Sequence, residues 1–108
     1  MKAATRMQSG STIVDVSGDI DMGTSPGLRK VLLESLKVTS RVVVNLREVR
    51  YIDSSGIASL VEVLMKARNS QKHLVLFGLN KAVQDVLQLT RLTTIFEIRE
   101  TEEEALKV

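Results

Sequence analysis

The 108-residue sequence contains no cysteine and no tryptophan, and it has only one proline, one tyrosine and two phenylalanines. The absence of cysteine excludes thiol catalysis, cysteine-ligated zinc and disulfide-stapled folds, and it is typical of a reducing compartment. No apolar run approaches the ~18 residues of a transmembrane helix, and the first residues lack the apolar stretch of a secretory signal. The sequence therefore predicts a cytoplasmic protein without a membrane partner.

An excess of one charge is also missing. Fifteen basic and thirteen acidic residues give a net charge of +2 at pH 7, and the two signs alternate along the chain. A nucleic-acid-binding protein needs a basic surface to neutralise phosphates and, for single strands, aromatic rings on which bases stack. With neither feature in the sequence, we do not expect nucleic acid as a partner.

What remains is the composition of an ordinary globular protein. The chain is 44% hydrophobic and 26% charged, and it contains no internal repeat and no linker rich in proline, glycine or serine. A chain of this length supports one hydrophobic core. We therefore expect a single domain over residues 1–108, and nothing in the sequence demands more than a monomer.

The first half of the chain predicts a hairpin, a helix and a buried strand. A β-branched run over 11–16 pairs with residues 3–7 and ends at the turn signal Ser17-Gly18. Ser25 caps a helix with Pro26 at its first position, and its apolar face contains Leu28, Val31, Leu32 and Leu36. The continuous apolar run over 41–46 is typical of a central strand that is covered on both faces.

The second half alternates between helices and strands. A helix ending near Asn69 has an apolar face of Ile57, Leu60, Val61, Leu64 and Met65. It is followed by a strand over 74–79 and by a helix that Asn80 caps, with an apolar face of Val83, Val86 and Leu87. The chain then continues with a strand over 94–98 and a short helix that has the capping box Thr101 and Glu104. This alternation predicts an α/β fold with a mixed, mainly parallel sheet.

The segment Asp53-Ser54-Ser55-Gly56 lies between a predicted strand and a predicted helix, where functional loops of such sheets collect. One explanation is purely structural: Asp53 or Ser54 caps the helix, and Gly56 allows a tight turn. A different explanation is that one of the two hydroxyl groups carries a function.

Catalysis by these serines is not expected. A serine nucleophile needs a base within hydrogen-bonding reach, and the single histidine, His73, lies at the start of a strand as a polar rim residue. The G-x-S-x-G elbow, phosphate-binding glycine motifs and metal-ligand spacings are all missing from the sequence. We therefore predict no catalytic residues, no cofactor and no metal.

A hydroxyl group that is itself modified fits the segment better. A phosphoryl group on Ser54 adds roughly −1.5 to −2 charges. The helix dipole and free N–H groups at a helix N-terminus tolerate that charge, so the fold survives. A partner docked on this surface would have to desolvate the charge, so one modification would end the binding.

Over nearly its whole length the chain resembles the STAS-domain anti-sigma factor antagonists of bacterial partner-switching systems. The resemblance rests on "VDVSGDID", on "RVVVNLREVRYIDSSGIASLVEVL" and on "LVLFGLNKAVQDVLQLTRLTTIFEIRETEEEAL", in this order and at the expected distances. It implies the STAS fold, with helices packed mainly on one side of the sheet.

The resemblance also implies a function. The unphosphorylated protein binds an anti-sigma factor that is a serine kinase with a histidine-kinase-like ATPase fold, and this binding releases the sigma factor. Phosphorylation of Ser54 ends the binding, and a metal-dependent serine phosphatase restores it. Carried over by position, Asp53, Ser55, Gly56 and Ile57 belong to the partner-binding surface.

Asp21 is carried over as part of the loop that flanks the same surface. The protein is then a substrate and not an enzyme. The alternative from another class is a non-catalytic STAS regulatory subunit of a transporter or signalling scaffold, which binds its partner constitutively and uses Ser54 only as a cap and contact residue.

Overall fold

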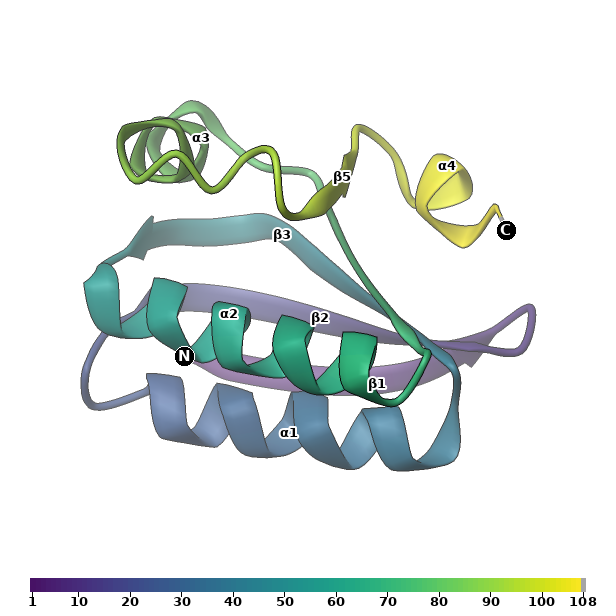
Figure 1. The fold of residues 1–108 in the computed structure, drawn as a ribbon. Coiled ribbons are helices and arrows are strands. Elements are labelled where there is room, and N and C mark those ends of the chain that lie inside the picture. Colours follow the sequence, from purple (N-terminus) through teal and green to yellow (C-terminus); the bar gives the residue numbers. More distant parts are fainter. Residues whose placement is uncertain (108) are drawn as a thin grey trace.

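A computed structural model describes residues 1–107 of the chain (Figure 1). One five-stranded sheet has the strand order β1-β2-β3-β4-β5. The strands are β1 (Lys2–Gln8), β2 (Ser11–Ile20), β3 (Arg41–Ile52), β4 (His73–Phe77) and β5 (Glu97–Arg99). The helices are α1 (Ser25–Val38), α2 (Ser54–Asn69), α3 (Lys81–Leu89) and α4 (Glu102–Leu106).

The pairing of the strands confirms the predicted mixed sheet. β1 and β2 form an antiparallel hairpin in which Gln8 pairs with Ser11. The pairs β2–β3, β3–β4 and β4–β5 are all parallel. β3 is the central strand, as its continuous apolar run predicted, because Val42, Val43 and Val44 are fully buried.

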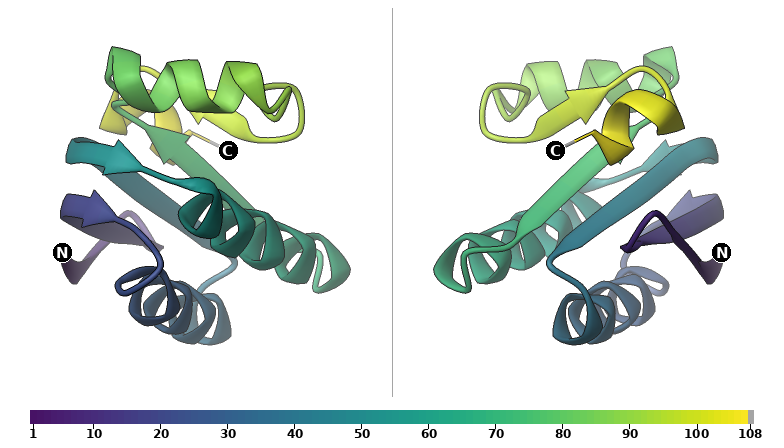
Figure 2. Two further views of the ribbon diagram at one scale, coloured as in Figure 1. Left: turned by 90° about the vertical axis from the view of Figure 1, so that its left-hand side faces the viewer. Right: turned by 90° about the vertical axis from the view of Figure 1, so that its right-hand side faces the viewer.

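The two faces of the sheet are covered unequally, as the resemblance implied. The larger core cluster joins buried residues of α1, α2 and α3 to the sheet, among them Leu32, Leu60 and Leu87. The smaller cluster on the opposite face contains Ala105 of α4 packed with residues such as Phe77. Figure 2 shows this arrangement, with α4 apart from the helices α1 and α2.

Two strands are longer than the sequence predicted. β2 continues through the expected turn at Ser17-Gly18 and ends at Ile20. Ser17 and Gly18 do not form a turn; they lie where the register of the β2–β3 pairing shifts. Gly18 adopts a φ of +92° there, a backbone angle that glycine tolerates best. β3 likewise extends to Ile52, so both strands reach the Asp53 turn.

Several boundaries and faces also differ from the predictions. α1 is preceded by Thr24 as the N-cap, so Ser25 is the first helical residue and not the cap. Met65, placed on the apolar face of α2, is 39% exposed, whereas Val63 and Ala67 are buried in its place. The last strand starts at Glu97 because the preceding residues form turns, with the Phe96 N–H donating to the Leu92 carbonyl.

Candidate functional site

The predicted site lies at the end of the sheet where β2 and β3 stop side by side. Ile20 pairs with Ile52 in the parallel ladder, and the Asp53 N–H donates to the Ile20 carbonyl at 3.1 Å. The next residues along the two chain segments, Asp21 and Asp53, therefore begin adjacent loops. The left view of Figure 2 looks onto this end, where α1 and α2 also start.

Asp53 is the N-cap of α2, which confirms the structural half of the sequence interpretation. Its Oδ1 accepts hydrogen bonds from the backbone N–H groups of Ser55 at 2.9 Å and Gly56 at 3.2 Å. Side-chain caps of this kind satisfy donors that the helix itself leaves unpaired. The same oxygen also accepts the hydroxyl hydrogen bond of Ser55 at 2.5 Å.

These hydrogen bonds keep Asp53 ionised. The hydroxyl of Ser55 is the main cause that holds the pKa of the Asp53 carboxyl below its usual range; burial opposes it, and the backbone N–H groups of Gly56 and Ser55 add to the lowering. The N-terminus of α2 thus already carries one fixed negative charge. The two N–H groups that were expected to be free for a phosphate are occupied by this carboxylate.

The two adjacent serines have different environments. Ser54 is exposed at the first position of α2. Within residues 1–107, no hydrogen bond joins its hydroxyl to another group. Ser55 is half-buried, and its hydroxyl is engaged by Asp53. Of the two hydroxyls, the one of Ser54 is the more accessible to an incoming enzyme.

Gly56 is required by packing rather than by an unusual backbone angle. A Cβ at this position would lie 2.6 Å from Cγ2 of Ile20 and 2.7 Å from Cγ1 of Ile52. Real Cβ atoms do not approach other atoms so closely, and both isoleucines are buried. The glycine therefore lets the first turn of α2 rest directly on the ends of β2 and β3.

Ile57, expected in the docking patch, is only 5% exposed and belongs to the larger core cluster. Its side chain fixes the first turn of α2 to the sheet and presents almost no surface to a partner. The exposed residues at this end of the sheet are different ones: Met22 in the loop after β2 is 78% exposed, Tyr51 near the end of β3 is 51% exposed, and Ala58 lies one helical turn after Ser54.

Sequence reasoning had a signal for Tyr51, the aromatic residue of the motif that ends in D-S-S-G. Met22 carried no such signal, because its exposure depends on the shape of the loop. Asp21 sets that shape: its Oδ1 accepts from the N–H groups of Gly23 at 3.0 Å and Thr24 at 3.1 Å. Asp21 thus holds the loop between β2 and α1 in place, and Met22 projects from it.

The single histidine lies far along the sheet from the two serines. His73 is exposed at the start of β4 and pairs with Arg41 at the beginning of β3, whereas Ser54 follows the far end of β3. Over the part of the chain that the structure describes, no group of three or more His, Cys, Asp or Glu residues is arranged to hold a metal ion. In that same range, none of the helices combines the length and apolar character needed to cross a membrane.

The chain resembles known proteins along most of its length. The family model of the STAS domain matches residues 2–105. A curated relative from Listeria monocytogenes, named anti-sigma-B factor antagonist, is 36% identical over 91 residues, which cover 82% of this chain and 79% of the relative.

Solved structures have the same fold. The crystal structure of a putative anti-sigma factor antagonist from Thermotoga maritima has a TM-score of 0.89 at 23% identity, covering 96% of this chain and 91% of the other. The phosphorylated form of the Bacillus cell fate determinant SpoIIAA has a TM-score of 0.73 at 17% identity, covering 97% of this chain and 96% of the other. The family match, the relative and the shared fold agree with the resemblance in the sequence, and the chain belongs to the STAS domain family.

Proposed function

We propose that this protein is an anti-sigma factor antagonist whose binding is switched off by phosphorylation of Ser54. The observation that carries the proposal is the contrast between two neighbouring hydroxyls, that of Ser54 exposed and unengaged and that of Ser55 held by Asp53. The name of the Listeria relative supports the antagonist role. The phosphorylated form of SpoIIAA supports modification as the switch.

The position of Ser54 explains how a phosphate acts on binding without unfolding the protein. Ser54 is exposed, so a phosphoryl group extends into solvent and displaces nothing from the core. The capping N–H groups of Ser55 and Gly56 are already bound to Asp53, so the new charge is not absorbed by the helix N-terminus. Roughly two negative charges are then added beside the Asp53 carboxylate, on a surface that a partner must desolvate.

The proposed cycle has three steps. The unphosphorylated protein binds an anti-sigma factor that is itself a serine kinase of the histidine-kinase-like ATPase fold. That kinase transfers the γ-phosphoryl group of ATP to the Ser54 oxygen, with ADP as the other product, and the phosphorylated protein dissociates. A metal-dependent serine phosphatase then hydrolyses the phosphate ester. This chain supplies the Ser54 hydroxyl as the substrate of the first reaction and the phosphoserine ester as the substrate of the second, in which water releases inorganic phosphate and restores the hydroxyl; it catalyses neither.

The test uses the cognate anti-sigma factor kinase with ATP. We expect intact-protein mass spectrometry to show the addition of one phosphate and peptide fragmentation to place it on Ser54. Ser54→Ala should remain unmodified, while the matched variant Ser55→Ala should still be phosphorylated. Phosphate found only at other residues would remove the proposed switch.

A second measurement separates this function from constitutive binding by a STAS regulatory subunit. The variant Ser54→Asp should bind the partner of the unphosphorylated protein at least tenfold more weakly than the unmodified chain does. Its unfolding midpoint should change little, because the side chain at position 54 is exposed. A substitution that leaves the affinity unchanged would favour the constitutive alternative, in which Ser54 serves only as a contact residue.

A further inference from the structure

The first strand leaves one edge of the sheet open. β1 pairs with β2 on one side only, and it is one of the two terminal strands of the sheet in the described chain, the other being the three-residue β5. Six of its seven residues are exposed, and Ala3 is half-buried. An exposed strand edge offers unpaired N–H and C=O groups to another strand, and proteins protect such edges with charges, prolines, bulges or covering elements.

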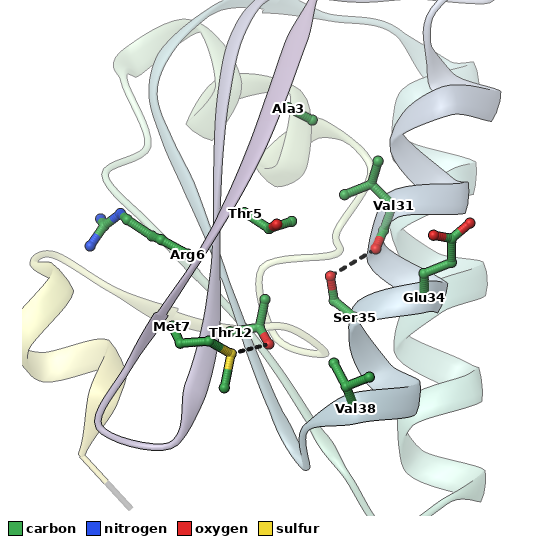
Figure 3. A pocket seen from close by; sticks show the side chains of 9 residues that line it. All are labelled: Ala3, Thr5, Arg6, Met7, Thr12, Val31, Glu34, Ser35 and Val38. Carbon is green, nitrogen blue, oxygen red and sulfur yellow. Dashed lines mark hydrogen bonds between the residues drawn. The ribbon is translucent and has the colours of Figure 1, made fainter.

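The helix-facing side of β1 is not covered by α1. A groove of about 450 Å³ runs between the strand and the helix, lined by residues that include Thr5, Met7, Val31 and Val38. Figure 3 shows Ala3 and Thr5 of β1 facing α1 across this groove. Met7 is 61% exposed and Val38 is 76% exposed, so apolar surface accompanies the open edge.

The charges of β1 do little to protect the edge. Arg6 pairs with Ile13, which belongs to the opposite face of the sheet. There it donates to Asp15 at 2.7 Å and forms an ion pair with Glu102, and Figure 3 shows it pointing away from α1. Its charge is neutralised on that face, and only Lys2 remains as a charged residue of the strand.

We propose that β1 pairs in antiparallel orientation with β1 of a second copy of this chain, about a twofold axis at Thr5. In this register Thr5 faces Thr5, Ala3 faces Met7, Ala4 faces Arg6, and Lys2 faces Gln8. No like charges are opposed, and each long side chain faces a short or neutral one. This self-complementarity of the sequence KAATRMQ is the observation that favours a second copy over an unrelated strand.

The pairing does not depend on the proposed function, and it leaves Ser54 accessible. Ser54 follows β3, which is separated from the β1 edge by β2. A twofold axis through the edge places the two Ser54 sites at opposite ends of the joined sheet, because paired copies of β1 run in opposite directions. The strand pair is small beside the roughly 1,600 Å² of standard stable interfaces, so we expect a weak dimer with a Kd on the order of 100 µM.

Sedimentation equilibrium across that concentration range tests the proposal. We expect the mean mass to rise towards twice the monomer mass, and Thr5→Lys or Thr5→Glu alone to reduce association at least tenfold, because like charges would then face each other across the axis. An equimolar mixture of the two variants should restore association through the opposite charges. Thr94→Lys and Thr94→Glu are matched controls at another exposed threonine and should associate as the unmodified chain does.

The chain contains no cysteine, so a single introduced thiol reports the register independently. Thr5→Cys should form a disulfide-linked dimer under mild oxidation, because directly opposed residues of paired strands lie at a separation that a disulfide can bridge. Thr94→Cys should crosslink far more slowly. A chain that stays monomeric at millimolar concentration would overturn the proposal and leave the edge open to strands of other proteins. A dimer that is indifferent to both Thr5 charge variants and fails to crosslink through Thr5→Cys would overturn it as well.

Discussion

The carboxylate of Asp53 accepts the hydroxyl hydrogen bond of Ser55 at 2.5 Å, through the same oxygen that caps the first turn of α2. One side chain therefore performs two tasks. It fixes the backbone that presents Ser54, and it occupies the hydroxyl of the neighbouring serine. Under the proposed function, Asp53 is a positioning residue that favours Ser54 over Ser55 as the acceptor of the phosphoryl group.

Replacing Asp53 by alanine should loosen this selection. Asp53→Ala removes the acceptor for the Ser55 hydroxyl and for two backbone N–H groups. We expect faster hydrogen exchange of the Ser55 and Gly56 amides and, with the cognate kinase, a measurable share of the phosphate on Ser55. Asp53→Asn keeps a carbonyl oxygen at the cap and should change the exchange rates less. Modification that stays entirely on Ser54 in Asp53→Ala would show that the kinase alone selects the acceptor.

The same carboxylate makes stability depend on pH in the acid range. Its pKa is lowered in the folded protein by the Ser55 hydroxyl and by backbone N–H groups, so the folded state favours the ionised form relative to the unfolded chain. This contribution is present above the unfolded pKa of about 3.9 and is lost as pH falls through the lower folded value. It therefore has its full size at pH 7.

Denaturant titrations of the unmodified protein and Asp53→Asn at a series of pH values test this. We expect the unmodified protein to be the more stable at pH 7 and the two to converge below about pH 4. Asp15 also has a lowered pKa, caused chiefly by its hydrogen bond with Arg6, so both proteins should lose stability in acid for that separate reason. A difference between them that is constant from pH 7 to pH 3 would contradict the assignment to Asp53.

Two glycines in helices should respond oppositely to the same substitution. At Gly56 a Cβ would meet Ile20 and Ile52 at 2.6 and 2.7 Å, so Gly56→Ala should lower the free energy of unfolding by roughly 1–3 kcal/mol through overpacking. At Gly27 of α1 an added Cβ would meet nothing within 4 Å beyond its chain neighbours and the backbone of its own helix. Gly27→Ala should raise stability by up to about 1 kcal/mol, because alanine is the better helix former.

Chemical unfolding of the two variants beside the unmodified protein measures this difference. The double variant Gly56→Ala with Ile52→Val removes the Cδ1 methyl group of Ile52, which would lie 3.2 Å from the added Cβ, and should recover part of the lost stability relative to Gly56→Ala. Equal, favourable effects of both alanine substitutions would mean that α2 shifts freely on the sheet, contrary to the close contact described above.

The part of this architecture that could be predicted from the sequence is the part with local causes. Asp53 and Asn80 precede apolar helical patterns, and both cap their helices as expected, with Asn80 accepting from the Val83 N–H at 2.9 Å. The β-branched run within residues 41–46 predicted the central strand. In each case the signal and the structure that it predicts lie within a few residues of one another.

The remaining features depend on contacts between distant segments. The need for glycine at position 56 comes from Ile52 and also from Ile20, which is far away in the sequence and meets α2 only after the sheet has formed. Ile57 looked equally suited to a docking surface and to the core, and only the packing of α2 on the sheet decided for the core. The extension of β2 past Gly18 likewise follows from its pairing with β3, which overrides the local turn signal.

The same dependence on tertiary structure brings two exposed apolar residues, Met22 and Tyr51, to the end of the sheet that carries the proposed phosphorylation site. Met22 lies in the loop after β2 that Asp21 holds in place, and Tyr51 pairs with Asp19 just before β3 ends. Single exposed apolar residues are common, but aromatic residues are also enriched where interfaces gain most of their binding energy. Both lie at the end of the sheet where β2 and β3 stop and Ser54 begins α2, and we therefore expect them to be apolar anchors of the bound partner.

Met22→Ser and Tyr51→Ser should each weaken binding of the unphosphorylated protein to its anti-sigma factor by roughly tenfold or more, measured by calorimetry. Their unfolding midpoints should change little, because both side chains are largely exposed. Val38→Ser is the matched control, since Val38 is 76% exposed but lies at the far end of α1. If all three variants bind alike, the partner gains its affinity from other residues around Ser54. If only the two variants at the site lose affinity, a phosphate on Ser54 acts at the centre of the interface, where a charge that must be desolvated opposes binding most strongly.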